Sequence, residues 1–176
     1  VTILRLRRIH AAHARMRFEE RKHLRRRRLP NTTAQATTSD TSGVSFAEAP
    51  LPETWRRPYD DVVVATILDG FSAQAFGYEW RQVPLTRTGW RSQMDEAQPD
   101  LLFVESAWHG NDDQWQYQLT GTSGVKESMR ELVAHCREQG IPTVFWNKED
   151  PVHFNRFKRT AALCDYVFTT DARTIV

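Results

Sequence analysis

Four apolar runs in the second two thirds of the chain constrain its fold most strongly. The first, DVVVATIL at 61–68, is continuous and rich in β-branched residues, a pattern typical of a strand buried on both faces of a parallel sheet. Three comparable runs follow it along the chain: PDLLFVES at 99–106, IPTVFWN at 141–147 and DYVFTTD at 165–171. The sequence therefore predicts four strong strands.

The segments between these runs favour helices. Residues 124–139 have apolar side chains at helical spacing, and Gly140 follows as a helix stop. The short piece QVPLT contains Pro84, which favours a sheet edge or a strand end. Further helices are expected at 71–80, at 88–98 beginning with Thr88, and at 153–164. Repeated βαβ units with right-handed crossovers predict an α/β fold with a Rossmann-like open parallel sheet.

Charge is distributed unevenly along the chain. Residues 1–28 contain eleven Lys or Arg and two Glu, which gives +9; the other residues carry −7, because the whole chain is +2. The first 29 residues are expected to form a basic helical segment that Pro30 ends. This segment could stay solvated, or dock on an anionic membrane surface or an acidic partner. Nucleic acid is not the expected partner, because no aromatic residues lie among the arginines of RRRRLP.

Composition also separates the remaining chain into two parts. Residues 30–59 are rich in Thr, Ser, Ala and Pro, so we expect a flexible linker there. Residues 60–176 are expected to form the Rossmann-like domain. Cys136 and Cys164 lack metal-ligand spacing and are interpreted as reduced, buried thiols of a cytoplasmic protein. Because no apolar run approaches the ~20 residues of a membrane span, any membrane association is expected to be peripheral.

Polar residues follow all four predicted strands. Ligands of open α/β sheets bind beyond the carboxyl ends of the strands, so these residues are the candidates for a site. Asp150, next to Pro151, could instead cap the following helix. His153 could be a structural imidazole, and the aromatic residues of the loop at 107–124 could either face a carbohydrate or pack against one another. A carboxylate at Glu105 would be costly at the end of a buried strand unless it is paired or faces a cleft.

Several common signatures are missing from the sequence. It contains no GxGxxG, GxxxxGK[ST], HExxH or GxSxG, so dinucleotide binding, P-loop chemistry, zinc proteolysis and serine hydrolysis lack their motifs. Asp112 and Asp113 form an isolated pair, which is poor support for a metal site, and no metal is predicted.

The strand ends carry a resemblance to a known family. VESAWHGN at 104–111, FWNKEDPVHF at 145–154 and DYVFTTD at 165–171 resemble the N-terminal half of the CgeB-like, spore-maturation-type bacterial glycosyltransferases. The resemblance covers about residues 60–172. It implies a GT-B architecture, in which this domain holds the acceptor and a C-terminal domain binds the nucleotide-sugar donor without a catalytic metal. No cofactor is implied for this domain itself.

The resemblance and the strand ends together give the candidate residues. Glu149, His153 and Glu105 are the candidate general bases for an inverting transfer, whereas a retaining enzyme would need no base in that role. The candidate substrate-binding residues are Asp69, Trp108, Asn111, Asn147, Lys148, Asp150 and Asp171. The predicted function is the acceptor-binding half of a glycosyltransferase acting on a glycan, cell-surface or protein acceptor. The alternative is a noncatalytic Rossmann-like binding or scaffold module recruited through its basic segment.

Overall fold

The computed structural model describes residues 56–121 and 125–174, so the predictions for the basic segment and for most of the linker lie outside the described residues. The strands are β1 (Tyr59–Ile67), β2 (Trp80–Pro84), β3 (Leu101–Glu105), β4 (Thr143–Asn147) and β5 (Tyr166–Thr169). The helices are α2 (Gly70–Phe76), α3 (Trp90–Ala97), α4 (Glu127–Glu138) and α5 (Phe154–Ala161), and a 3₁₀ turn, η1 (Ala172–Thr174), follows β5.

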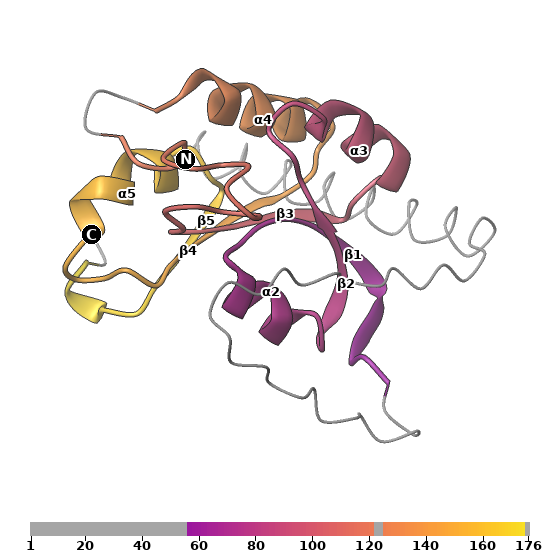
Figure 1. Ribbon diagram of the computed structural model, residues 1–176, viewed down its shortest axis with the longest axis horizontal. Coiled ribbons are helices and arrows are strands. Elements are labelled where there is room, and N and C mark those ends of the chain that lie inside the picture. Colours follow the sequence, from indigo (N-terminus) through magenta and orange to yellow (C-terminus); the bar gives the residue numbers. More distant parts are fainter. Residues whose placement is uncertain (1–55, 122–124, 175–176) are drawn as a thin grey trace, which may run out of the picture.

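The five strands form one parallel sheet in the order β2-β1-β3-β4-β5. The α/β class and the Rossmann-like open parallel sheet are thereby confirmed (Figure 1). The first three residues of QVPLT belong to β2, which starts earlier, at Trp80, where the sequence predicted the end of a helix. Strand β2 lies at an edge of the sheet and ends at Pro84, where the missing amide hydrogen removes no central ladder bond.

The main core lies between the sheet and helices α3, α4 and α5, which Figure 1 shows on the same side of the strands. Residues paired across a parallel sheet point to the same face, so Ile67, Val104 and Phe145 form one buried row. Helix α4 packs Leu132 and Cys136 against this side. Burial of this apolar stripe on both elements is what fixes the helices on the sheet.

The opposite face of the sheet carries α2 and a cluster of half-buried aromatic rings. Phe76 of α2 stacks on Trp80 with ring centroids 4.8 Å apart, and it meets Phe103 and Trp146 edge to face at 5.1 and 5.3 Å. The indole nitrogen of Trp80 is buried without a hydrogen-bond partner among the described residues. Aromatic packing therefore covers the middle of this face with a single short helix.

Strand β5 is exposed at the other edge of the sheet. Its side chains Tyr166, Val167 and Phe168 are 57, 51 and 58% exposed. The continuous burial that the apolar pattern predicts is thus found in β1, where residues 64–67 are buried, but not in β5. The difference arises because β5 has a sheet neighbour on one side only among the described strands.

One predicted helix start is wrong, and one helix cap that the sequence allowed is not used. Helix α3 begins one residue after Gly89, not at Thr88, and the nearby Thr86 pairs with Gln93 through its backbone N–H, at 2.8 Å, and its hydroxyl. Helix α5 has His153 at its N-cap position, so Asp150 does not cap it. Gly140 does follow α4 in the left-handed conformation, with φ +63°. None of the helices in the described ranges is long and apolar enough to cross a membrane.

Both cysteines are free thiols, Cys136 buried and Cys164 half-buried. Burial raises the pKa of each thiol to about 12, so the reactive thiolate is scarce near neutral pH. We expect iodoacetamide to modify neither residue in the native chain and both residues in urea, as measured by intact mass over time. Rapid native labelling of Cys136 would contradict the described packing of α4.

Candidate active site at the carboxyl edge of the sheet

The strand order reverses between β1 and β3, since the chain leaves β1 for β2 on one side and then crosses to β3 on the other. In open α/β sheets this switch point opens a crevice at the carboxyl ends of the strands. Asp69 follows β1 closely, Glu105 ends β3, and Lys148 directly follows β4. The fold therefore brings together three residues that are 36 and 43 positions apart in the chain.

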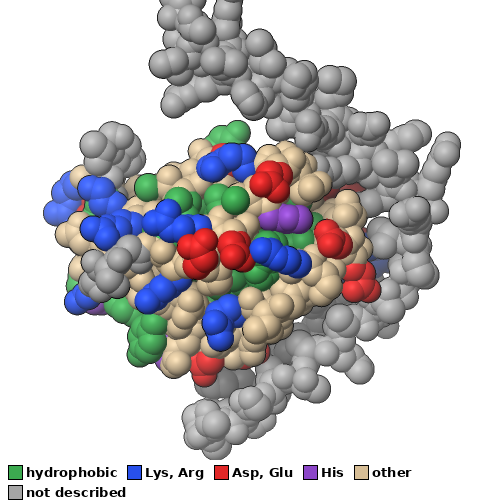
Figure 2. Space-filling model, turned by 90° about the horizontal axis from the view of Figure 1, so that it is seen from above, with side chains coloured by type: hydrophobic (Ala, Val, Ile, Leu, Met, Phe, Trp, Pro, Cys, Tyr) green, Lys and Arg blue, Asp and Glu red, His purple; other side chains and the backbone are tan. Residues whose placement is uncertain are grey.

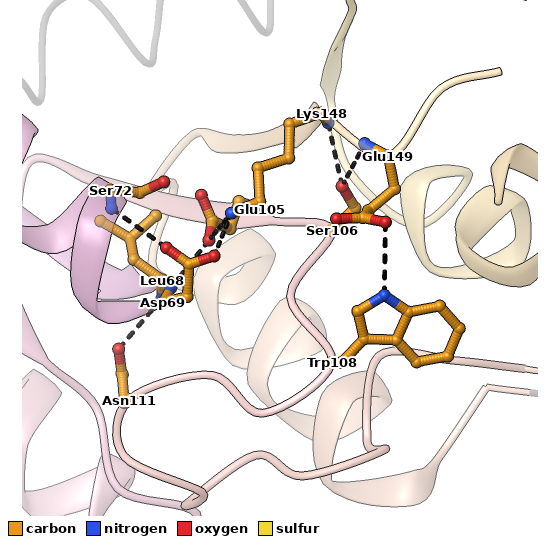
Figure 3. Close-up of polar contacts among 9 residues, drawn as sticks. All are labelled: Leu68, Asp69, Ser72, Glu105, Ser106, Trp108, Asn111, Lys148 and Glu149. Carbon is orange, nitrogen blue, oxygen red and sulfur yellow. Dashed lines mark hydrogen bonds and ion pairs between the residues drawn. The ribbon is translucent and has the colours of Figure 1, made fainter. Parts of the chain in front are cut away.

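Lys148 lies between two carboxylates in this charged cluster, which we define as Asp69, Glu105 and Lys148 (Figure 3). Its ammonium group forms an ion pair with Asp69 Oδ2 and lies 3.1 Å from Glu105 Oε1. The same Glu105 oxygen accepts the backbone N–H of Asp69 at 2.7 Å. The cluster is formally negative with both carboxyl groups ionised and neutral with Glu105 protonated, so the lysine charge is compensated in either state.

Glu105 is fully buried at the end of β3. Burial raises the pKa of its carboxyl group, against the opposing influence of Ser72 and Lys148. Figure 3 shows the Ser72 side chain pointing toward this carboxyl group, although Oε2 has no hydrogen bond of regular geometry among the described residues. Glu105 Oε2 is thus a buried oxygen without a partner among the described residues, beside Asp69 and Lys148, and functional sites retain polar groups of this kind.

The pKa values of Asp69 and Lys148 both shift in the direction that favours the charged form. Burial alone raises the pKa of Asp69, but hydrogen bonds from Lys148 and from the backbone of Ser72 outweigh it and lower that pKa. Burial lowers the pKa of Lys148, and the contacts with Asp69 and Glu105 outweigh it and raise that pKa. Lys148 is therefore a held cation, not a neutral amine available as a nucleophile.

Ser106 connects the charged cluster to a second group of residues. Its hydroxyl accepts the backbone N–H groups of Lys148 and Glu149 at 2.9 and 3.1 Å. The Glu149 carboxylate accepts the indole N–H of Trp108 at 3.3 Å (Figure 3), and the His153 ring meets Trp108 edge to face at 5.1 Å. Glu149, Trp108 and His153 thus lie together beside Lys148, and all three side chains are partly exposed.

The polar side-chain atoms of Asn111 form hydrogen bonds with backbone groups. Its side-chain oxygen accepts the N–H of Leu68 at 3.0 Å, and its amide donates to the carbonyl groups of Thr66 and Leu85 at 2.7 and 2.9 Å. It also adopts the left-handed conformation that Asn tolerates, with φ +48°. Through these hydrogen bonds, Asn111 connects the ends of β1 and β2 to the loop after β3.

Asn147 and Asp150 form a separate polar group at the ends of β4 and β5. Asp150 accepts hydrogen bonds from the Asn147 amide, at 2.6 Å, and from the hydroxyl of Thr169. These contacts are why Asp150 does not act as the cap of α5. The Asn147 side-chain oxygen is buried without a partner among the described residues. Asp171 lies beyond β5 and forms an ion pair with Arg173, whose Nη2 lies 2.7 Å from Asp171 Oδ2.

Three contributors were missed by sequence reasoning. Ser106 and Ser72 support the charged cluster, and His109 pairs through Nδ1 with Asp113 Oδ1 at 2.5 Å. The position of Ser106 directly after Glu105 was the available signal, since a hydroxyl at a strand end can bind the next strand's loop. The His109 and Asp113 spacing was visible, but their pairing depends on a loop conformation that the sequence does not define.

The described residues contain no group of three or more His, Cys, Asp or Glu side chains that could hold a metal ion. Trp115 is one of the loop aromatics that could either face a carbohydrate or pack. It is fully buried and donates its indole N–H to the Leu85 carbonyl at 2.7 Å, so it packs. Comparisons with protein-family models, curated proteins and solved structures give no match.

The charge of Asp69 gives a pH-dependent prediction. Because its folded-state pKa is lowered from 3.8, the charge stabilises the fold above that value, and the contribution is lost as pH falls through the folded-state pKa. Asp69→Asn removes the charge but keeps a residue that caps helices well. In urea unfolding, we expect the stability difference from the wild type to be present near neutral pH and to shrink in acid. Asp95→Asn, on the exposed face of α3, is the control; a difference that grows in acid would contradict the ion pair.

The structural role of Asn111, which connects the ends of β1 and β2 to the loop after β3, gives a second prediction. Asn111→Ala leaves backbone groups of Leu68, Thr66 and Leu85 without their side-chain partner, so it should lower the free energy of unfolding by about 2 to 4 kcal/mol. The exposed Asn155→Ala change in α5 should have little effect. Unchanged stability of Asn111→Ala, combined with loss of ligand binding, would instead make Asn111 a ligand-contacting residue.

Proposed function

We propose that this chain is the acceptor-binding domain of a nucleotide-sugar-dependent glycosyltransferase. The observation that carries the proposal is the compensated lysine at the switch point, where two carboxylates, one ammonium group and nearby hydroxyl and indole groups meet. Hydroxyl groups of a sugar both donate and accept hydrogen bonds, so they match a site with carboxylate acceptors and N–H donors. The resemblance of the strand ends to the CgeB-like glycosyltransferases supports the same function.

The charge balance favours a neutral acceptor over a phosphorylated donor. A phosphate group is recognised by uncompensated Lys or Arg side chains or by helix N-termini. Here Lys148 already pairs with Asp69 and Glu105, and the Asp69 carboxylate occupies the N-terminus of α2 by accepting the N–H of Ser72 at 3.0 Å. A nucleotide sugar would therefore be held by a second, donor-binding domain, as in the GT-B arrangement.

Among the three candidate bases, Glu149 fits the role best if the transfer inverts configuration. Glu105 is fully buried and engaged with Lys148, so an acceptor hydroxyl cannot reach it without rearrangement. His153 packs edge to face on Trp108. Glu149 is partly exposed, and only its Oε2 receives the Trp108 N–H, which leaves Oε1 for an acceptor hydroxyl. Trp108 would then hold the carboxylate in position while the other oxygen removes the proton.

The face drawn in Figure 2 carries side chains of both charges. Figure 2 shows basic side chains gathered toward one end of the face drawn there and acidic side chains among basic ones over the rest of it.

A second candidate function, a noncatalytic interaction module, is favoured by a different observation: the exposed apolar side chains of β5, which could contact a partner. In that case ligand binding would involve β5 and not the charged cluster.

Amide NMR of the whole chain, titrated with neutral hexose oligosaccharides and then with nucleotide sugars, tests the proposal. We expect shifts centred on residues 105–108 and 148–153 with the oligosaccharides and none there with the nucleotide sugars. Shifts with nucleotide sugars alone would contradict acceptor binding, and silence with every sugar would favour the interaction module.

Glu149→Gln supplies the matched variant for this titration. It preserves the shape and the Trp108 contact but removes the negative charge, so oligosaccharide binding should weaken about threefold to tenfold. Glu138→Gln, at an exposed position at the end of α4, should bind as the wild type does. Equal binding by both variants would remove Glu149 from the site.

A further inference from the structure

The loop between β3 and α4 presents a second surface beside Glu149. Tyr117 is 54% exposed, its ring meets Trp108 edge to face at 6.5 Å, and Trp108 in turn donates to Glu149. The His109 ring lies 5.9 Å from the Tyr117 ring. We call the exposed residues Tyr117, His109 and Asp113 the loop platform. The indole ring of Trp108 separates the loop platform from the carboxylate of Glu149, the proposed general base.

The loop platform is held in place by buried contacts beneath it. Trp115 is fully buried, donates its indole N–H to Leu85 and its backbone N–H to the Gly110 carbonyl at 3.1 Å. On the far side, Thr160 of α5 donates its hydroxyl to the Leu119 carbonyl at 2.8 Å, and Leu119 is itself buried. The backbone that carries the exposed rings is therefore held before any ligand binds, which lowers the entropy lost on binding.

Backbone conformation also directs these side chains outward. Asp112, Asp113 and Tyr117 all have positive φ, at 53°, 65° and 53°. Aspartate adopts such values more readily than most residues, but they are uncommon for tyrosine and persist there only where neighbouring contacts determine them. The Tyr117 backbone N–H donates to the Trp108 carbonyl at 2.8 Å, which is one such contact. The result is an exposed tyrosine held beside His109 instead of packing into the core with Trp115.

The hydrogen bonding of His109 defines what it can offer a ligand. Its Nδ1 lies 2.5 Å from Asp113 Oδ1 and 3.4 Å from Gln116 Nε2. A carboxylate can only accept, so we assign the Nδ1 proton to the shorter contact, with Asp113. In the neutral ring, Nε2 is then an acceptor that faces away from Asp113. A hydroxyl group can donate a hydrogen bond to Nε2. The C–H face of a sugar ring can lie on the electron-rich face of the Tyr117 ring.

We propose that the loop platform binds a saccharide unit adjacent to the one held at the charged cluster and Glu149. The inference rests on the proposed acceptor-binding function and specifies its substrate class: a neutral glycan of at least two sugar units. The first unit occupies the carboxyl edge of the sheet, and the second stacks on Tyr117 and donates a hydroxyl hydrogen to His109 Nε2.

Isothermal titration of the whole chain with neutral hexose oligosaccharides of increasing length tests this inference. Tyr117→Ala should weaken binding of oligosaccharides about twofold to tenfold and leave monosaccharide binding unchanged, because only the longer ligands reach the platform. Tyr117→Phe keeps the aromatic face and should bind as the wild type does. Tyr59→Ala is the matched control, because Tyr59 has the same 54% exposure but begins β1, at the opposite end of the strands.

The outcomes separate the two proposals. If Glu149→Gln weakens oligosaccharide binding and Tyr117→Ala does not, the loop platform is overturned while acceptor binding stands. If neither monosaccharides nor oligosaccharides bind the wild-type chain, both proposals fail. If Tyr117→Ala weakens monosaccharide and oligosaccharide binding equally, Tyr117 belongs to the first site and the second subsite is overturned. Thermal unfolding of each variant shows whether a change in binding reflects a change in folding.

Discussion

The buried Glu105 carboxyl group is the constraint on which the carboxyl edge of this sheet depends. A carboxylate without solvent must be paired, and here one of its oxygens receives both the Lys148 ammonium and the backbone N–H of Asp69. These contacts connect the ends of β1, β3 and β4. They also position Asp69 at the start of α2, where its other interactions, with Lys148 and with Ser72, can form. One desolvated group thus orders three loops of the site.

The same arrangement has a chemical consequence. A lysine at a sheet's carboxyl edge usually suggests recognition of an anion, but its charge here is used within the protein. What the edge offers a ligand is a set of acceptors and donors without an uncompensated cation, with aromatic rings at one side. Trp108 links both parts, since its ring contacts Tyr117 and His153 and its N–H binds Glu149. These properties suit a neutral, hydroxyl-rich molecule better than a phosphate.

Much of this fold follows from local patterns. The continuous apolar runs predict the strands because a buried parallel strand needs apolar residues on both faces. The convergence of Asp69, Glu105 and Lys148 follows from the polar residues at the ends of those strands. Other features depend on contacts between distant residues. Asn111 has the composition of a ligand-binding residue, but its partners, Leu68 and Leu85, lie 43 and 26 positions away. Asp150 has the sequence of a helix cap, but Asn147 and Thr169 compete for it.

In the proposed function, compensation of the Lys148 charge makes this edge a site for neutral glycans. Isothermal titration of the chain with a neutral oligosaccharide, and with the same oligosaccharide carrying a phosphate monoester, tests this role of Lys148. We expect saturable binding of the neutral form and weaker binding of the phosphorylated form, because the added charge meets Asp69 and Glu149. Tighter binding of the phosphorylated form would show that Lys148 is available to anions and would rule out a site for neutral glycans.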